Sequence, residues 1–572
     1  LMSVWSKLGN RNFAVFYGKN AVNIYQDFRK GIQGLGVDEQ KGFLKTVEST
    51  YRDLASVLIA QGRISEAEQV LVMLKEEELI DYVRRDDDVA KGLLATMALT
   101  EDERSALVRY QASTSAVTAL GKEFGELEDE RKAYAVGQFP KQKRYDELKQ
   151  QLADATIVFE KFLEELKIKF GQNDTRVAQV DSSLKKTLER LKAKRTVSVS
   201  TIVGEDALNI IVTTSKTQRA HTIKKSAKEI NELVAKFRIS LTSPQYDPRP
   251  TGQLLYDLIV KPIEGDLAGI NADTILWSLD GTLRYIPPAA LWDKSKGYLA
   301  ERFSNVIINL ASRDTLALPV ASGRKLSVLG VGVSKPVESF SALTAVPDEL
   351  DCIVSDRTAG ILSMSPQCSK GVLSGRKLLD ETFTLANFEG ELGRYPIIHI
   401  ASHFKLTPGD DKNSFLLLGG GSERKFTVEK LRGEPLTDVE LIVLSACNTA
   451  TPGGARANGV EIEGFGSIAQ KEGAKSVMAT LWSVADSSTK DFMVEFYRLY
   501  GNQGKSKAAA MRLSQLKLMY GKYSAEEVAD KHRADAFVAP ADGSLPKFVP
   551  DPNAPFAHPF YWSPFILIGN WR

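Results

Sequence analysis

The chain has 572 residues, more than one hydrophobic core usually holds, so its length predicts three or four domains. Its 43% hydrophobic and 26% charged residues exclude fibrous and disordered classes, and its net charge of +2 gives no overall signal for nucleic acid or an anionic membrane. No apolar run approaches the ~18 residues of a membrane helix, and three cysteines, an odd number, argue against a disulfide framework and for a reducing cytoplasm.

Residues 1–95 carry two copies of a helix-pair pattern that resembles the tetratricopeptide (TPR) repeat. The copies are "WSKLGNRNFAVFYGKNAVNIYQDF", from Trp5, and "YRDLASVLIAQGRISEAEQVL", from Tyr51, with "GR" at the turn between two helices. Two repeats are fewer than the ~3 that a stable array needs, and the chain opens on Leu1. We therefore expect the end of a longer array, with a generic helical bundle as the alternative.

Residues 96–195 are rich in Lys, Glu, Leu and Ala and predict long helices. Apolar residues recur at helical spacing over 145–170 and 180–195, with a turn at 171–175. The charge runs are expected to be solvated helix faces, and a lever or a dimerising coiled coil is the alternative.

The period changes at residue 196. Alternating residues over 196–215 predict a hairpin, and residues 196–322 as a whole predict an α/β region without an obvious nucleophile. A second α/β region occupies 323–572, with near-continuous apolar strands such as "LSVLGVG", "YPIIHIAS", "SFLLLGG", "VELIVLSA", "AKSVMATLW" and "PFILIGNW". Helical stretches between several of them predict a mostly parallel sheet covered on both faces.

Two of these strands end on reactive side chains. The strand "IIHIAS" leads to His403, and the strand "LIVLSA" leads to Cys447. Because functional groups gather at the carboxyl ends of parallel strands, we expect both side chains at one edge of the sheet. A neutral imidazole can take the thiol proton, and the thiolate is the competent nucleophile. The pattern predicts a His/Cys dyad, with the backbone N–H groups of Cys447 and Phe404 placed to hold an oxyanion.

Other interpretations remain open from the residues alone. A strand-end cysteine is often a packing residue. His399, four residues before His403, is expected to be a hydrogen-bonded core residue, and Cys352 and Cys368 are expected to be inert.

No metal or cofactor is predicted. The other histidines have no cysteine or carboxylate partners at metal-ligand spacing: His221, His532 and His558. "GVGVSK" (330–335) lacks the third glycine of a dinucleotide fingerprint, and "GGGS" (419–422) lacks the end of a phosphate loop. Both are expected to be turns.

Several segments, in order, resemble the CHAT family, whose caspase-like cysteine peptidase domains commonly follow TPR repeats. They are "IIHIASHF", "LIVLSACNTA", "NGVEIEGFGSIAQKEGAKSVMATLWSVADSST" and "HPFYWSPFILIGNW". The resemblance implies an α + α/β protein in which a TPR-like and long-helix region precedes an inactive caspase-like half (196–322) and an active half (323–572). It also implies that His403 is the general base and then acid, and that Cys447 is the acylated nucleophile.

The chain departs from the family at one position. Caspase-like proteins often have glycine directly after the catalytic histidine, whereas this chain has Phe404, whose side chain must point away from the cleft if its N–H is to serve the oxyanion. The stretch 523–560, rich in Ala, Pro and Asp, is expected to be a long surface insertion, either a flap or a cleavable segment.

Three carboxylates are candidates for a substrate pocket that would favour a basic side chain: Glu461, Glu463 and Asp486. The competing interpretation places Glu461 and Glu463 at a helix N-terminus, where they complement the dipole, and Asp486 as an N-cap.

The residues and the resemblance together predict a cytoplasmic cysteine endopeptidase that cleaves a protein substrate. The resemblance implies a protein activator bound through the TPR/helical region and a setting in bacterial defence or programmed cell death. The alternatives are a catalytically silent scaffold and an acyltransferase that uses the same dyad. No nucleic-acid or membrane partner is predicted, and the oligomeric state is left open.

Overall fold

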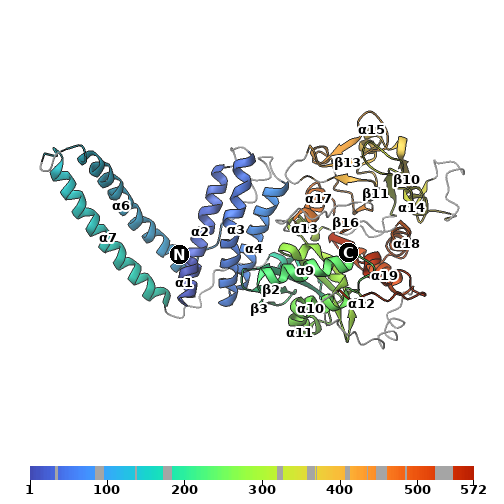
Figure 1. The fold of residues 1–572 in the computed structure, drawn as a ribbon, viewed down its shortest axis with the longest axis horizontal. Helices are drawn as coiled ribbons and strands as arrows, with labels where there is room; N and C mark the ends of the chain where they lie inside the picture. The colour runs from blue at the N-terminus through green and yellow to red at the C-terminus, as the bar shows by residue number, and fades with distance from the viewer. Residues whose placement is uncertain are drawn as a thin grey trace. The chain divides into compact units, whose positions relative to one another are not determined.

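The computed structural model describes residues 1–32, 37–83, 96–134, 138–171, 183–318, 326–356, 368, 370–405, 407, 412–434, 436–445, 460–482, 486–521 and 545–572. The chain forms two compact units (Figure 1). The helical unit comprises Leu1–Met73 and Lys91–Asp181, and the sheet unit comprises Leu74–Ala90 and Ser182–Arg572.

The described residues of the helical unit form six helices. These are α1 (Met2–Lys7), α2 (Arg11–Ile32), α3 (Val37–Ala60), α4 (Ile64–Val83, whose residues from Leu74 on belong to the sheet unit), α6 (Glu101–Arg131) and α7 (Gln142–Gly171). The predicted "GR" turn is confirmed, because α3 ends at Ala60, α4 begins at Ile64 and Gly62 adopts φ +73. The predicted helix over 145–170 lies within α7. The identity of α1–α4 as TPR repeats stays a prediction.

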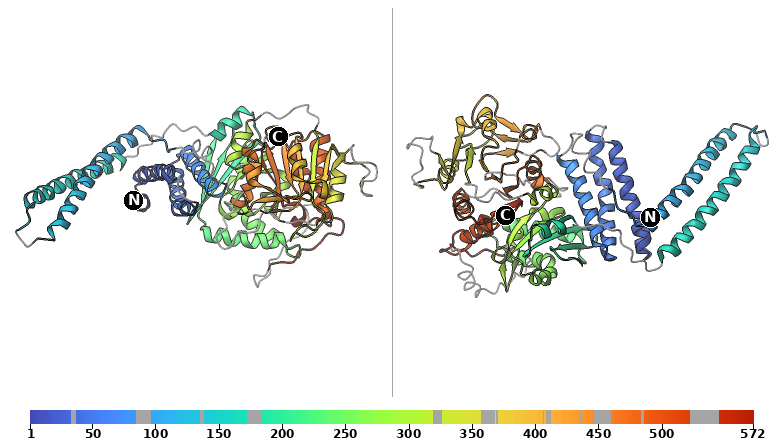
Figure 2. Two further views of the ribbon diagram at one scale, coloured as in Figure 1. Left: turned by 90° about the horizontal axis from the view of Figure 1, so that it is seen from above. Right: turned by 180° about the vertical axis from the view of Figure 1, so that it is seen from behind.

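The long helices α6 and α7 pack on each other as an antiparallel hairpin (Figures 1 and 2). Near the tip, the rings of Phe124 and Tyr145 stack with their centroids 4.8 Å apart. Many charged side chains of this hairpin face solvent, as in the ion pair of Arg144 with Glu123, where both are about half exposed. The solvated-face interpretation holds for these residues but not for Glu103 of α6, which is buried and paired with Lys19 and Arg63. The predicted turn at 171–175 lies almost wholly outside the described residues, and α8 (Ser183–Arg190) is shorter than the predicted helix over 180–195.

The sheet unit is organised around a twelve-stranded sheet in the order β3-β2-β1-β4-β7-β17-β16-β15-β11-β8-β10-β9. Its strands are β1 (Thr196–Val203), β2 (Leu208–Thr213), β3 (Gln218–Ile223), β4 (Thr274–Ser278), β7 (Ser304–Ile307), β8 (Val328–Gly332), β9 (Val354–Asp356), β10 (Leu373–Leu379), β11 (Ile397–Ala401), β15 (Leu441–Leu444), β16 (Ser476–Thr480) and β17 (Phe565–Gly569). The hairpin predicted over 196–215 is confirmed as β1 and β2.

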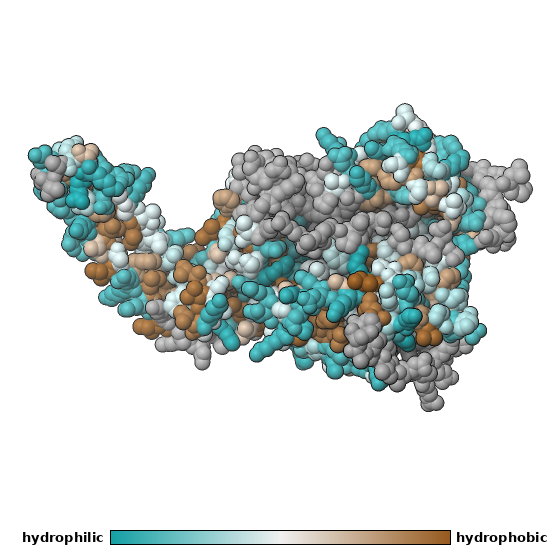
Figure 3. Space-filling view, in the orientation of Figure 1, coloured by the Kyte–Doolittle hydropathy of each residue, from teal (hydrophilic) through white to brown (hydrophobic). Residues whose placement is uncertain are grey.

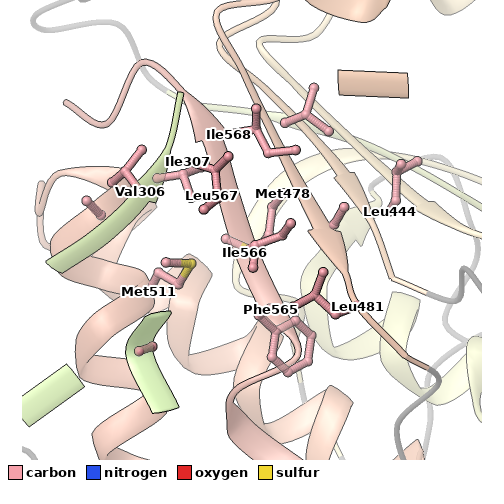
Figure 4. Packing of buried hydrophobic residues seen from close by; sticks show 14 of the residues in the cluster. Val306, Ile307, Leu444, Met478, Leu481, Met511, Phe565, Ile566, Leu567 and Ile568 are labelled. Atoms are coloured by element: carbon pink, nitrogen blue, oxygen red, sulfur yellow. The ribbon is translucent and has the colours of Figure 1, made fainter. Parts of the chain in front are cut away.

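The sheet runs without a break from the first α/β region into the second. The last strand, β17, joins them, because it pairs antiparallel with β16 and parallel with β7. In Figure 4, β17 lies between these two strands, and Met511 of α19 (Lys507–Tyr520) packs in the same cluster.

The predicted strands were found, with two differences. The segment "SFLLLGG" forms β13 (Phe415–Leu417), which belongs to a separate antiparallel sheet with β12 (Phe404–Lys405) and β14 (Lys425–Thr427). The final strand is antiparallel to its neighbour β16, whereas β8, β11, β15 and β16 run parallel.

Helices lie on both sides of the strands in the second region (Figure 1). On one side α14 (Val346–Ile353) packs against α18 (Asp486–Tyr497), which packs against α19. On the other, α17 (Val460–Lys471) packs against α13 (Leu310–Leu316) and β16. The expected covering of both faces is thus confirmed for these strands.

Candidate functional site at the β8/β11 edge

The strand order reverses direction between β8 and β11. The chain leaves β8 and reaches β10 on one side, whereas β11, β15 and β16 follow on the other side. In open α/β sheets the crevice outside the carboxyl ends of the strands at such a switch point is where ligands bind. The loops that follow β8 and β11 therefore define the candidate site.

His403 lies two residues after the end of β11, at this switch point. The side chain is half-buried, and its Nε2 lies 2.9 Å from the carbonyl oxygen of Ser341, in the loop after β8. The ring of Phe340 lies against the imidazole with centroids 5.1 Å apart and also meets the edge of Phe415 in β13. The imidazole is thus held by one hydrogen bond and one ring contact.

The loop that presents Ser341 is itself braced. The carboxylate of Asp380, directly after β10, accepts hydrogen bonds from the Ser334 N–H (2.7 Å) and hydroxyl (2.6 Å). The Leu343 N–H donates to the Ser334 carbonyl, which closes the loop. The position of the Ser341 carbonyl is therefore fixed from both ends of the loop.

This contact determines which ring nitrogen of His403 carries the proton. A carbonyl oxygen only accepts, so Nε2–H is the donor to Ser341. In the neutral imidazole, Nδ1 then carries the lone pair and can accept a proton. The tautomer is that of a general base acting through Nδ1.

Cys447 lies outside the described residues. The chain is described up to Ser445, whose N–H donates to the Ile400 carbonyl of β11 (2.9 Å). β11 and β15 are parallel neighbours, with Ile400 opposite Leu444. The segment leading to Cys447 therefore leaves the sheet at the same edge as His403, and the pairing of the two side chains stays a prediction.

The side chain of Phe404 is buried in an apolar cavity. The cavity lies between β11, β15 and the small sheet, and it includes Ile398, Ile400 and Leu444. The backbone of Phe404 belongs to β12, which pairs with β13. Just before β12, the Leu417 N–H of β13 donates to the His403 carbonyl. Because hydrogen-bonded pairs alternate along an antiparallel ladder, the N–H of Phe404 is directed away from β13. The bulky residue thus fills the core, as the oxyanion assignment requires.

The three carboxylates proposed for a substrate pocket all lie in the first turn of a helix. Glu461 and Glu463 are in the first turn of α17, and Asp486 is the first residue of α18. Their side chains lie outside the described residues. The helix-opening interpretation agrees with the positions of Glu461 and Glu463, whereas Asp486 is the first helical residue and not the N-cap. A role of the three carboxylates in a pocket stays a prediction.

The cysteine count argued against a disulfide framework, but the structure contains a disulfide. Cys352, in α14, and Cys368 form a disulfide with Cα atoms 5.3 Å apart. An odd number of cysteines does not exclude a disulfide, because a disulfide needs only two cysteines that the fold brings together; here Cys447 is the third. The cysteine count therefore no longer supports a reducing compartment.

The expectation for His399 is confirmed. The side chain is fully buried and hydrogen-bonded to Tyr497 and Glu349. Among the other histidines, His221 lies 2.8 Å from Asp266, and His558 lies 2.8 Å from the Tyr246 carbonyl.

The expectation that "GVGVSK" forms a turn was wrong. Gly330 and Gly332 lie inside β8, where a Cβ at either position would come within 2.6 and 2.5 Å of Val354 and Val346. Glycine here permits the close approach of α14 to the strand. No nucleotide role follows from this arrangement.

Sequence reasoning missed the residues that hold His403: Ser341, Phe340 and Asp380. A backbone acceptor leaves no signal in residue type, and the position of Asp380 directly after a strand would have been a signal only if β10 had been predicted. Within the described ranges no three His, Cys, Asp or Glu side chains cluster as a metal site would require. No helix in those ranges is both long and apolar enough to cross a membrane.

The fold and the site define an α/β protein with a histidine oriented at the switch point of a large mixed sheet. The family model described as "CHAT domain" matches residues 249–570, more than half of the chain, and the chain belongs to this family. No curated protein matches.

Solved structures with similarity include a separase and a cysteine proteinase. The separase of the Saccharomyces cerevisiae separase–securin complex is 10% identical with a TM-score of 0.35, over 90% of this chain and 52% of that chain. The Arg-specific cysteine proteinase gingipain R is 8% identical with a TM-score of 0.29, over 60% of this chain and 74% of that chain. The present chain thus spans about half the length of that separase.

Proposed function

We propose that this CHAT-domain protein is a cysteine endopeptidase in which His403 and Cys447 act as a dyad on a protein substrate. The single observation that carries the proposal is the contact of His403 Nε2 with the Ser341 carbonyl at the switch point, beside the strand that leads to Cys447. A histidine held in this tautomer offers Nδ1 as a base to a group emerging from the neighbouring strand.

In the first chemical step, Nδ1 of His403 takes the proton of the Cys447 thiol, and the thiolate attacks the carbonyl carbon of the scissile peptide bond. The Ser341 carbonyl stabilises the imidazolium through Nε2–H. The backbone N–H groups of Phe404 and Cys447 bind the oxyanion of the tetrahedral intermediate.

The intermediate collapses when the C–N bond breaks. Nδ1–H of His403 then gives its proton to the leaving amine, and the substrate acyl group stays on Cys447 as a thioester. In the second half, His403 takes a proton from water, the hydroxide attacks the thioester, and the Cys447 thiol leaves with the proton returned. Each step is general acid or base chemistry at one imidazole.

The test uses covalent labelling of Cys447. With Cys352 and Cys368 in a disulfide, a non-reduced sample offers Cys447 as the one remaining thiol among the three cysteines. We expect a peptidyl acyloxymethyl ketone with arginine beside the reactive group to label wild type at Cys447, and labelling to disappear in Cys447→Ala.

A matched histidine pair separates chemistry from folding. His403→Gln is expected to lower the labelling rate by at least about 100-fold, the scale of general-base catalysis. His221→Gln, a histidine of the first region beside Asp266, serves as the control and should label at the wild-type rate. Equal rates for His403→Gln and wild type would refute the dyad.

The silent-scaffold alternative makes the opposite prediction. A scaffold with an inert Cys447 would react with the peptidyl probe no faster than a free thiol in an unfolded chain, and His403→Gln would change nothing. The acyltransferase alternative labels like the peptidase, and it is separated by whether the acyl group passes to water or to an added amine.

Regulation by a protein partner bound through residues 1–195 is part of the proposal and comes from the family resemblance. Exposed apolar side chains support a partner surface on the helical unit, among them Ile24 and Phe28 of α2, and Figure 3 shows hydrophobic residues gathered along this unit. TPR character, a cytoplasmic location and a role in bacterial defence or programmed cell death complete the proposal.

A further inference from the structure

A buried polar network links four elements around the candidate site, and no step of the proposed chemistry uses it. Its members are His399 in β11, Glu349 in α14, Ser445 after β15 and Tyr497 in α18. His399 Nδ1 lies 2.9 Å from Tyr497 Oη, and His399 Nε2 lies 3.1 Å from Glu349 Oε1. The Ser445 hydroxyl hydrogen-bonds the same oxygen of Glu349. All four side chains are buried.

The chemistry of these groups selects one arrangement of protons. Burial raises the pKa of Tyr497 well above its usual range, so its hydroxyl keeps the proton and donates it to His399 Nδ1. Nε2–H of His399 then donates to Glu349, and the Ser445 hydroxyl donates to the same carboxylate oxygen. One oxygen of Glu349 thus holds groups from two neighbouring strands.

The surroundings of this network are apolar. Val346 and Leu350 of α14 pack with Ala401 of β11. Val346 and Leu350 lie three residues before and one residue after Glu349, and Ala401 lies two residues after His399. Burying a carboxylate in such a layer lowers the stability of the fold unless its hydrogen bonds are complete. Apolar side chains of similar volume in its place often give a fold that is as stable. A buried polar network instead constrains geometry, because each donor has one acceptor.

The network residues lie on the segments that carry the proposed site. His399 precedes His403 by four residues, and Ser445 precedes Cys447 by two. Glu349 lies in α14, which directly follows the loop that presents Ser341 to His403. One carboxylate therefore joins the three segments on which the dyad and its orienting carbonyl depend.

We infer that Glu349, acting through His399 and Ser445, positions His403 and Cys447 for reaction. Glu349 is a positioning residue, because its hydrogen bonds run to His399 and Ser445. The inference rests on the proposed function, since it concerns the geometry of the same dyad.

The experiment compares Glu349→Gln, Ser445→Ala and their double variant in the full chain. Glutamine keeps the size of Glu349 but replaces one acceptor oxygen with a donor, and alanine removes the Ser445 donor alone. The control is Ser476→Ala. Ser476 is also buried, and its hydroxyl donates to the backbone carbonyl of Glu440 (2.6 Å). It is the first residue of β16, at the end of the strand away from the candidate site.

The readouts are the maximal inactivation rate (kinact) and the half-saturating concentration (KI) of the arginyl acyloxymethyl ketone, with the melting temperature measured in parallel. We expect kinact to fall by about 10–100-fold in Glu349→Gln with KI within about threefold, as for a misplaced reacting group. The double variant should be no slower than the slower single variant, because both changes break one unit. Ser476→Ala should keep kinact whatever its melting temperature.

Two results would overturn the inference. One is an unchanged kinact in both Glu349→Gln and Ser445→Ala; the other is a fall in kinact that Ser476→Ala reproduces at an equal loss of melting temperature. If Glu349→Gln fails to fold, Ser445→Ala alone decides.

Failure of the proposed function gives a different result. Wild type would then show no peptidyl labelling at Cys447, and the rate of alkylation by iodoacetamide at that thiol becomes the readout. A changed alkylation rate in Ser445→Ala relative to Ser476→Ala supports positioning of Cys447 even so, and equal rates overturn it.

Discussion

Substitutions at Asp380 test the candidate site without touching the dyad. Asp380 directly follows β10, and its carboxylate accepts hydrogen bonds from the Ser334 N–H and hydroxyl and, at 3.3 Å, from the Lys335 N–H. It also adopts φ +49, in the left-handed region. Asp380→Ala removes the acceptor and leaves a Cβ in that conformation, whereas Asp380→Gly removes the acceptor and relieves the strain.

The magnitudes follow from these two features. Hydrogen bonds to a charged group contribute about 1.5–3 kcal/mol, so loss of the acceptor should cost both variants at least about 2 kcal/mol. Relative to glycine, an alanine in the left-handed region costs ~1–2 kcal/mol, against which the freer unfolded chain of the glycine variant offsets ~0.4–1 kcal/mol. Asp380→Ala is therefore expected to be less stable than Asp380→Gly by about 0.5–1 kcal/mol.

Urea unfolding followed by intrinsic fluorescence measures the stabilities, and probe labelling of Cys447 measures the effect on the site. Because the Ser334 end of the loop is released, the Ser341 carbonyl loses its fixed position and both variants should label at least about tenfold more slowly. Asp380→Asn, which keeps a carbonyl oxygen and tolerates the left-handed conformation, should fall between them and wild type. Wild-type labelling by a folded Asp380→Ala chain would refute the role given to the loop.

Three further predictions concern the rest of the sheet unit. Burial lowers the pKa of Lys507 from 10.5 to about 7, so Lys507→Met should stabilise the fold by up to about 5 kcal/mol at pH 6 and by less at pH 9. Thermal unfolding at both pH values checks this, and a destabilised variant at pH 6 contradicts it. Burial also lowers the pKa of His558 to about 4, below the ~6.5 of an unfolded histidine. The stability that neutral His558 contributes is therefore present above about pH 6.5 and is lost as the pH falls towards 4. In urea unfolding, His558→Asn, which keeps a helix cap, should lose less stability than wild type between about pH 7 and pH 4.5. Gly332→Val should destabilise by about 1–3 kcal/mol or more, because its Cβ would lie 2.5 Å from Val346 and 3.0 Å from the Ala401 carbonyl; an unchanged melting temperature would show that α14 can move away without cost.

The core strands of the second region could be predicted because strands buried on both faces are short, nearly continuous apolar runs. β10 escaped this rule, since its sequence "LSGRKLL" carries Arg376 and Lys377, which pair with Glu391 and Asp351. The shared sheet also escaped prediction. It depends on β17 pairing with both β16 and β7, and no local pattern reports which distant strand will be a neighbour.

At the site, the sequence identified His403 from the end of its strand but not what orients it. The acceptor is the carbonyl of Ser341, 62 residues earlier, and every residue has a carbonyl. His399 was correctly predicted to be a hydrogen-bonded core residue, although no spacing pointed to Glu349 as its partner. The disulfide of Cys352 escaped prediction for the same reason, since contact across the fold decided it.

The two faces of β11 have separate consequences for the site. Ile398 and Ile400 point into the apolar cavity that also holds Phe404, whereas His399, between them, points to the opposite face and to Glu349. A cavity made on the apolar face removes packing energy and leaves the hydrogen-bonded geometry in place. A broken hydrogen bond on the polar face leaves the packing and releases the strand end that carries His403. Stability and reactivity should therefore respond to different neighbouring residues of one five-residue strand.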